Sequence, residues 1–120
     1  MDILQPDVVI CGGIGSALAV ADLARLHGVA LMPHTSGGAI GIAATLQLLA
    51  ALDDVTRSPG SEPLLLEFGQ GVNPWRTDIL QQPHEVRGGR LRIPDGPGLG
   101  VEVDARQIES RAVLHLEVTR

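Results

Sequence analysis

The stretch from Asp7 to His34, DVVICGGIGSALAVADLARLHGVALMPH, decides the fold. An apolar run ends at Gly12-Gly13, a helical pattern of apolar residues follows, and a second apolar run ends at Pro33-His34. The glycine pair indicates a turn, and the change of periodicity indicates a strand that leads into a helix. This order predicts a βαβ unit with parallel strands.

The same pattern extends on both sides of this stretch. It predicts strands over 3–11, 29–32 and 64–66, with a helix over 17–26 capped by Ser16 and stopped at His27-Gly28. A second helix over 40–52 is apolar on all sides and must therefore be largely buried. A polar loop over 53–63 joins it to the third strand, and the β-α-β-α-β order is typical of a parallel sheet covered by helices.

The pattern changes after residue 72. Residues 86–93 alternate around Gly88-Gly89 and predict a β-hairpin. A closing helix is expected over 105–111, with Asp104 as its cap. We expect one domain over 1–120, with the parallel part at 1–72 and the hairpin and tail at 73–120.

The composition excludes several classes of function. The chain has 120 residues, a net charge of −5 and only 2% aromatic residues. Its nine basic residues are all arginines, scattered and without interleaved aromatics, so nucleic-acid binding is not expected. The single cysteine, Cys11, is interpreted as a small buried apolar residue. No apolar stretch is long enough to cross a membrane and no signal peptide is apparent, so a cytoplasmic location is expected.

Three titratable residues, Asp7, His34 and Glu67, each stand at or just beyond the end of a short apolar run. They are 27 and 33 positions apart, about one strand, one helix and two turns each time. Such spacing places the three side chains on one rim of a parallel β/α sheet or barrel, where these folds carry out their chemistry. The other histidines, His27, His84 and His115, follow no motif and are interpreted as surface residues.

A dinucleotide-binding site is the alternative for the glycine-rich turn at Gly13-Ile14-Gly15-Ser16, because such turns let a pyrophosphate approach a helix N-terminus. The register does not fit, since the third glycine position holds Leu18. No acidic residue follows at the required distance beyond the next strand. We therefore set this alternative aside.

Several motifs together resemble the C-terminal part of the mandelate racemase and muconate lactonizing group of the enolase superfamily. They appear in that family's order over nearly the whole chain: Gln5-Pro6-Asp7, Gly12-Gly13, Pro33-His34, Leu66-Glu67, Asn73-Pro74-Trp75-Arg76 and the run from Ile93 to Asp104. The resemblance implies a partial (β/α) barrel. It also implies an α-proton abstraction on a hydroxy acid or acid sugar, either dehydration or racemisation, with dehydration favoured by the Asn73 to Asp78 segment.

The resemblance also implies roles for the three rim residues. His34 would be the general base or acid at the α-carbon, and Asp7 would orient its imidazole. Glu67 would donate a hydrogen bond to a substrate carboxylate oxygen as charge develops. A carboxylate beside one ring nitrogen fixes the tautomer of histidine and raises the basicity of the other nitrogen.

The family uses Mg²⁺, held by carboxylates on barrel strands three to five. By resemblance this chain starts within the sixth strand, so those ligands and the family's lysine base on strand two would lie upstream of Met1. Asp2, Asp53, Asp54 and Glu62 are too dispersed to replace them, because Mg²⁺ requires converging oxygens. We therefore expect no tight metal binding by this chain and no activity of the chain alone.

Two functional hypotheses remain open at this stage. The first is the C-terminal portion of a mandelate racemase-like enzyme. The second is a non-catalytic remnant or assembly module, because unpaired strand edges and an apolar helix favour self-association or pairing with a missing barrel part.

Overall fold

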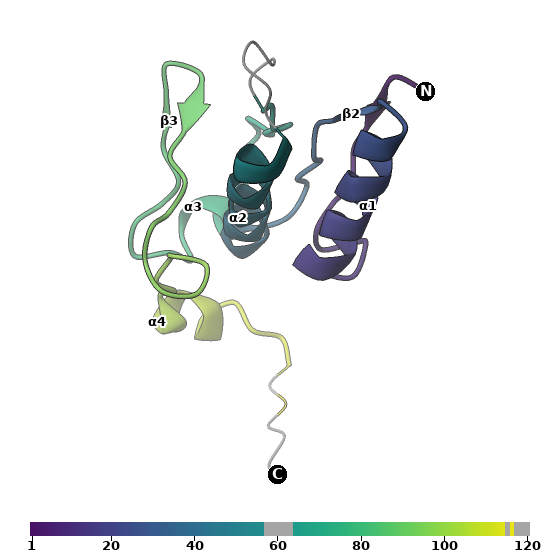
Figure 1. Ribbon diagram of the computed structural model, residues 1–120. Helices are drawn as coiled ribbons and strands as arrows, with labels where there is room; N and C mark the ends of the chain where they lie inside the picture. Colours follow the sequence, from purple (N-terminus) through teal and green to yellow (C-terminus); the bar gives the residue numbers. More distant parts are fainter. Residues whose placement is uncertain (57–63, 115, 117–120) are drawn as a thin grey trace.

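A computed structural model describes residues 1–56, 64–114 and 116, with the backbone alone for 53–56. It is a small α/β structure with two short pairs of strands (Figure 1). The elements, in chain order, are β1 (Ile3–Leu4), α1 (Ile14–Leu26), β2 (Ala30–Leu31), α2 (Ala39–Thr56), α3 (Pro74–Thr77), β3 (Val86–Arg87), β4 (Arg90–Leu91) and α4 (Ala105–Glu109).

The βαβ unit predicted from the first stretch is present. β1 pairs in parallel with β2, with Ile3 opposite Ala30 and Leu4 opposite Leu31. Hydrogen bonds between the two segments continue past the strands to Pro6, whose carbonyl accepts from the His34 amide at 3.1 Å. The backbone therefore delivers the residues after β1 and β2 to the same rim.

The first strand is much shorter than the predicted 3–11. Asp7 begins a turn instead, because its carbonyl accepts from the Cys11 amide at 2.8 Å and its side chain accepts from the Val9 amide at 2.9 Å. The apolar run after Asp7 is thus not sheet: Val9 is 66% exposed and Ile10 is 76% exposed. Cys11 is only partly buried and packs against the core.

The helix α1 begins earlier than predicted. Gly13, not Ser16, is its N-cap, and no side chain caps this end. Gly12 and Gly13 have φ angles of 99° and 105°, which only glycine adopts readily, and they turn the chain straight into the helix at Ile14. Ser16 consequently lies inside the first turn.

The helix α1 ends at the stop predicted from the sequence, His27-Gly28. Gly28 has a φ of 64°, and its amide binds the carbonyl of Arg25 at 3.2 Å. The Val29 amide binds the carbonyl of Ala24 at 2.9 Å, which completes a Schellman motif. This stop turns the chain directly into β2.

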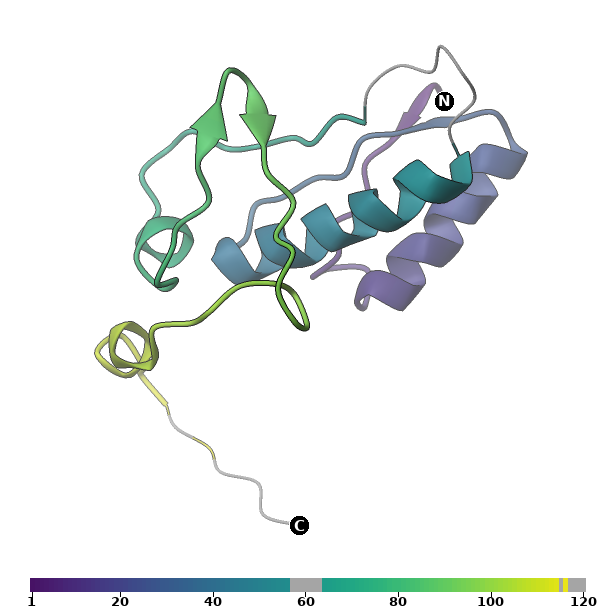
Figure 2. The same ribbon diagram turned by 60° about the vertical axis from the view of Figure 1, so that its left-hand side comes forward.

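The helix α2 is largely buried, as its composition predicts, and it runs beyond the expected end at Leu52 to Thr56. It lies beside α1 (Figure 2). The main core cluster joins the turn after Asp7 to both helices, through Val8, Ala17, Ala21, Leu48, Leu49 and Leu52. The predicted loop over 53–63 is therefore helical at its start, and its residues 57–63 lie outside the described residues.

The third predicted strand, 64–66, is not a regular strand. Leu64 and Leu66 still pack against the main core cluster, and the segment reaches the rim through one backbone bond. In that bond the Glu67 amide donates to the carbonyl of Pro33 at 3.1 Å. The segment is therefore placed as expected without forming a strand, and a closed barrel is not seen in the described residues.

The hairpin β3–β4 forms around Gly88 and Gly89, whose φ angles of 57° and 72° suit a type I′ turn. The closing helix α4 has the predicted cap, since the Asp104 carboxylate accepts from the Arg106 and Gln107 amides, but it ends at Glu109. The helix α3 was not predicted from the sequence; the Asn73 side chain caps it by accepting a hydrogen bond from the Trp75 amide. A second core cluster of Ala39, Ile79 and Leu80 joins the start of α2 to the segment that follows α3.

Candidate active site

The structure brings Asp7 and His34 into direct contact at the rim. Asp7 follows β1 and His34 follows β2, and the Oδ2 atom of Asp7 lies 3.0 Å from Nδ1 of His34. The Asp7 side chain is 8% exposed, whereas that of His34 is 35% exposed. A buried carboxylate therefore supports an imidazole that is accessible from outside.

Both oxygens of the Asp7 carboxylate have partners. Oδ1 accepts from the Val9 amide at 2.9 Å and from the Ile10 amide at 3.3 Å. Burial acts to raise the pKa of Asp7, but hydrogen bonds from Val9, His34, Ile10 and Ser36 outweigh it and hold the pKa below its ordinary value. Asp7 is thus ionised near neutral pH.

The ionised carboxylate determines the tautomer of His34. A carboxylate only accepts hydrogen bonds, so Nδ1 of His34 must carry the proton that points at Asp7. In the neutral ring this leaves the lone pair on Nε2. Because the ring is about one-third exposed, Nε2 is suited to take a proton from a bound molecule and to return it.

Glu67 reaches the same rim from the third segment. Its backbone is held at two points, by the Pro33 carbonyl and by the Thr35 hydroxyl, which donates to the Glu67 carbonyl at 2.7 Å. Its side chain is exposed and accepts a hydrogen bond from Nε2 of Gln5 at 3.0 Å. Within the described residues, neither Asp7 nor His34 forms a side-chain hydrogen bond with Glu67, so the three residues share a rim without forming one chain of hydrogen bonds.

Gln5 and Thr35 also contribute to the rim, and neither was predicted from the sequence. Thr35 is buried, with 8% exposure, and its signal was its position directly after His34. Gln5 was noted only within a motif. Gln5 lies two residues before Asp7, and residues with this spacing point to the same side of an extended segment. This spacing is the signal that could have identified Gln5.

The remaining histidines lie away from these contacts. His27 is exposed, as expected. His84 is half-buried, which corrects the surface interpretation, and its Nε2 lies 2.9 Å from the carbonyl oxygen of Ala39 at the start of α2. His115 falls outside the described residues.

The described residues do not fit a magnesium site. Within 1–56 and 64–114, side chains of 53–56 excepted, no three or more His, Cys, Asp or Glu side chains converge as metal ligands. Both oxygens of the Asp7 carboxylate already accept hydrogen bonds. Among the same residues, no helix is both long and apolar enough to cross a membrane.

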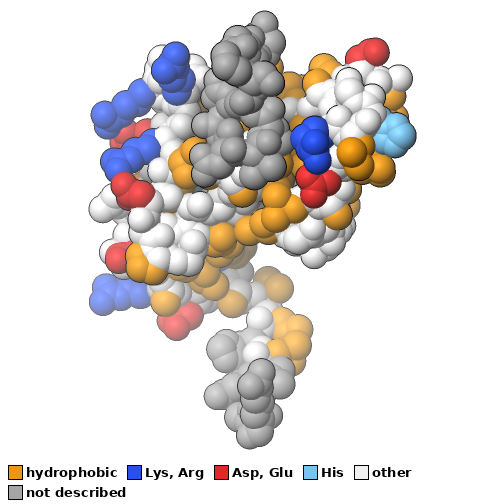
Figure 3. Space-filling view, viewed as in Figure 1, with side chains coloured by type: hydrophobic (Ala, Val, Ile, Leu, Met, Phe, Trp, Pro, Cys, Tyr) orange, Lys and Arg blue, Asp and Glu red, His pale blue; other side chains and the backbone are white. Residues whose placement is uncertain are grey.

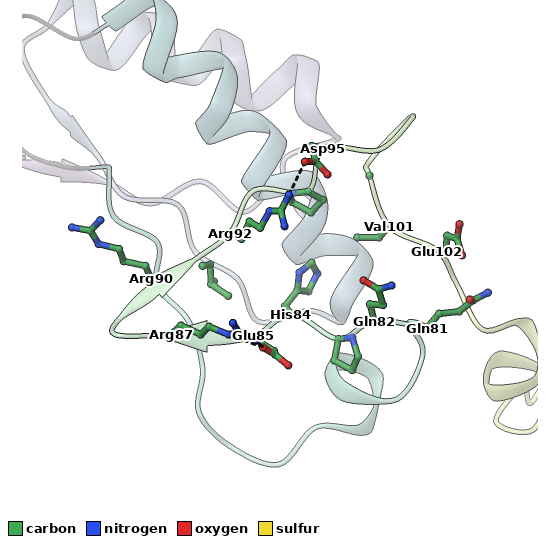
Figure 4. A pocket seen from close by; sticks show the side chains of 14 residues that line it. Gln81, Gln82, His84, Glu85, Arg87, Arg90, Arg92, Asp95, Val101 and Glu102 are labelled. Carbon is green, nitrogen blue, oxygen red and sulfur yellow. Dashed lines mark hydrogen bonds and ion pairs between the residues drawn. The ribbon is translucent and has the colours of Figure 1, made fainter.

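An open pocket of about 1000 Å³ lies elsewhere, beside the β3–β4 hairpin (Figure 4). Arg92 pairs with Asp95 at 2.7 Å, and Arg87 pairs with Glu85 at 2.6 Å, so much of its positive charge is neutralised. None of the three rim residues lines it. The pocket therefore adds nothing to the site at the rim.

The fold and the rim define a β/α protein with a carboxylate–histidine pair where its parallel segments end. The chain belongs to the enolase C-terminal domain-like family, whose model matches residues 1–108, and within the enolase superfamily to the C-terminal part of the mandelate racemase and muconate lactonizing group. This agrees with the resemblance seen in the motifs.

The relatives include enzymes that act on acid sugars and their lactones. D-galactarolactone cycloisomerase of Agrobacterium fabrum is 46% identical over 105 residues, covering 87% of this chain and 28% of that protein. Arabinonate dehydratase of Saccharolobus solfataricus is 35% identical, covering 86% of this chain and 25% of that protein. The chain thus spans about a quarter of these relatives' length.

A comparison with solved structures also finds a cycloisomerase. The crystal structure of 3,6-anhydro-D-galactonate cycloisomerase from Zobellia galactanivorans matches with a TM-score of 0.76 and 34% identity, over 92% of this chain and 29% of that one. Dehydratases were expected among the relatives. Cycloisomerases were not, since the sequence analysis named only dehydration and racemisation.

Proposed function

We propose that this chain supplies the histidine side of an active site that removes the α-proton of a hydroxy acid, an acid sugar or its lactone. His34 is the general base and acid through Nε2, and Asp7 is the residue that orients it. The contact between Asp7 and Nδ1 of His34, at 3.0 Å beneath an exposed ring, carries this proposal. The names of the relatives support the substrate class.

Glu67 has the complementary role in this proposal. Removing an α-proton leaves negative charge on the carboxyl oxygens of the substrate, and a nearby acid stabilises that charge by donating a hydrogen bond. Glu67 is exposed at the same rim, and its backbone is anchored to the residues on either side of His34. Its carboxyl group is thus available to a molecule bound over the rim.

Mg²⁺ is part of the proposed complete enzyme by family resemblance, and its ligands would come from residues other than those described. A histidine alone cannot offset the free-energy cost of the charge that α-proton removal leaves on the substrate. A general base accelerates a reaction by only about 10²–10⁴-fold. Enzymes typically provide about 10⁶-fold or more. We accordingly propose that the chain alone is inactive.

A hybrid enzyme tests the function directly. The segment of the Agrobacterium cycloisomerase that aligns with this chain is replaced by this chain, and lactone turnover is measured together with exchange of the substrate α-proton for deuterium. The hybrid should be active. His34→Asn should lower turnover by about 10²–10⁴-fold, whereas His27→Asn, at an exposed position on the end of α1, should leave it unchanged.

Two results count against the proposal. One is a hybrid in which His34→Asn is as active as the parent. The other is a hybrid that folds and binds lactone but neither exchanges the α-proton nor turns over, while the unmodified cycloisomerase does both.

The second candidate is a non-catalytic assembly module, and the surface of α1 favours it. Leu23 is 55% exposed and Leu26 is 72% exposed, and Val9 and Ile10 in the turn before α1 are exposed as well. Figure 3 shows hydrophobic side chains on the face that carries α1. Within the described residues β1 pairs only with β2, which leaves its outer edge free for another strand.

This candidate predicts association. Light scattering coupled to size-exclusion chromatography should show an oligomer, or a complex with a separately expressed piece of a related barrel, and Leu26→Glu should weaken either one. A parent chain that stays monomeric at all concentrations and captures no barrel piece would exclude the module.

A further inference from the structure

Gln5 is the residue whose side chain contacts Glu67, through Nε2 and Oε2 at 3.0 Å. We propose that Gln5 is a positioning residue for Glu67, which holds the carboxyl group so that Oε1 is the oxygen available to a ligand. This inference rests on the function proposed above for Glu67.

The backbone of Glu67 leaves only its side chain to be positioned. Its amide donates to Pro33, and its carbonyl accepts from the buried Thr35 hydroxyl. Two bonds on opposite sides of one residue fix its peptide groups, but the exposed side chain still rotates about its own bonds. The hydrogen bond from Gln5 selects one of those rotamers.

The chemistry of the contact fixes which carboxyl oxygen is used. An ionised carboxylate only accepts, so the Gln5 amide must present its NH₂ group to Oε2 and not its oxygen. When Glu67 is protonated, its carbonyl oxygen accepts the Gln5 N–H better than its hydroxyl oxygen does, and Oε2 is the oxygen that faces Gln5. The proton therefore sits on Oε1, from which it can be donated to a substrate oxygen.

The segment 5–7 positions both Glu67 and His34. Gln5 lies two residues before Asp7, and the carbonyl of the intervening Pro6 binds the His34 amide at 3.1 Å. Gln5 contacts Glu67, whereas Asp7 contacts His34. Variants at 5 and 7 should thus have separate effects, which provides a matched internal control.

The experiment uses the full chain labelled with ¹³C and ¹⁵N. Three-bond couplings report the rotamers of Glu67, and ¹⁵N shifts of the His34 ring report its proton position. In Gln5→Leu, and in Gln5→Glu at neutral pH, the population ratio of the native Glu67 rotamer should fall by roughly two- to tenfold, as expected for one net hydrogen bond. The His34 signals should stay unchanged.

Acid provides a rescue that a merely structural role would not give. In Gln5→Glu, lowering the pH until one of the two carboxyl groups is protonated restores a donor, and the native rotamer should return. Gln5→Leu should show no such return.

Unchanged Glu67 couplings in both variants, with His34 signals intact, would overturn the proposal. If a variant loses the His34 signals, Glu67→Leu is used instead. Because Glu67→Leu removes the acceptor of the Gln5 side-chain amide, the signals of that amide should move from their parent positions. Amide signals that do not move would also overturn the proposal. An inactive hybrid enzyme would refute the proposed function without altering these couplings, so the two failures are distinguishable.

Discussion

Replacing Asp7 by asparagine should reverse the proton position on His34 while leaving the fold intact. The asparagine oxygen can still accept from the Val9 and Ile10 amides, which now bind Oδ1 at 2.9 and 3.3 Å. Its NH₂ group takes the place of Oδ2 and faces Nδ1 of His34. Because two donors cannot share a hydrogen bond, Nδ1 becomes the acceptor and the ring proton moves to Nε2.

The structure also predicts the cost of removing the side chain altogether. Asp7→Ala leaves four donors without this acceptor: the amides of Val9, Ile10 and Ser36 and the Nδ1–H group of His34. The Ile10 amide keeps a second acceptor, the Asp7 carbonyl at 3.1 Å, and the His34 ring is open to water. Losing these hydrogen bonds to a charged acceptor should cost about 1–3 kcal/mol of unfolding free energy, while Asp7→Asn should cost less.

Long-range ¹H–¹⁵N correlation spectra of the imidazole, together with urea unfolding, measure both effects. The parent should show Nδ1–H in the neutral ring, and Asp7→Asn should show Nε2–H with little loss of stability. Identical ring spectra in the parent and in Asp7→Asn would refute the assignment of Asp7 as the orienting residue.

Four further outcomes are expected. Because the pKa of Asp7 is lowered in the fold, its contribution to stability is present above the unfolded value of about 3.9 and is lost as the pH falls through the folded value, so acid unfolding should be less steep in Asp7→Asn. Gly38→Ala should cost about 1–3 kcal/mol in urea unfolding, since its Cβ would lie 2.8 Å from the Trp75 carbonyl oxygen. Gly37→Ala, with nothing within 4 Å, is the control and should cost less than half as much. Calorimetric titration should find Mg²⁺ binding no tighter than about millimolar, because Mg²⁺ gives up its waters reluctantly and converging carboxylates are missing from the described residues; a micromolar site would contradict this. The chain alone should exchange no α-proton of hydroxy acids or acid sugars for deuterium, with or without Mg²⁺, and exchange that His34→Asn abolishes would show that it forms a working site by itself.

The sequence predicted the parts of the fold that depend on local chemistry. Gly28 stops α1, Gly88-Gly89 turns the hairpin and Asp104 caps α4, because each feature depends on a conformation or hydrogen bond that few residue types supply. The start of α3 had a comparable signal in Asn73-Pro74, a capping residue followed by a proline suited to the first helical position, and it was overlooked.

The errors have a common physical cause. Apolar composition predicted strands over 3–11 and 64–66, but it does not specify hydrogen-bond partners. After Asp7 the backbone bonds to itself, since a carboxylate that accepts from the Val9 and Ile10 amides makes a turn more favourable than an extended chain. Leu64 and Leu66 are in the core without a ladder, because packing requires only that their side chains be buried.

The spacing predicted that Asp7 and His34 lie together, and the backbone bonds explain why short strands suffice to bring them into contact. Two of the rim residues follow a proline directly, as Pro6-Asp7 and Pro33-His34. In both cases the proline carbonyl accepts from the rim residue of the next segment: Pro6 from His34 and Pro33 from Glu67, each at 3.1 Å. Proline has no amide hydrogen, so at these positions the chain can accept from its neighbour but cannot donate.

The repeated contact aligns the three segments at the point where the functional side chains begin. Each bond joins the residue before one rim side chain to the amide of the next rim residue, so the offset between neighbouring segments is set at the rim itself. Regular pairing farther back, only two residues in each of β1 and β2, contributes little to that alignment. The Asp7–His34 contact therefore depends on bonds within this chain, and it should form whether or not other barrel strands are present.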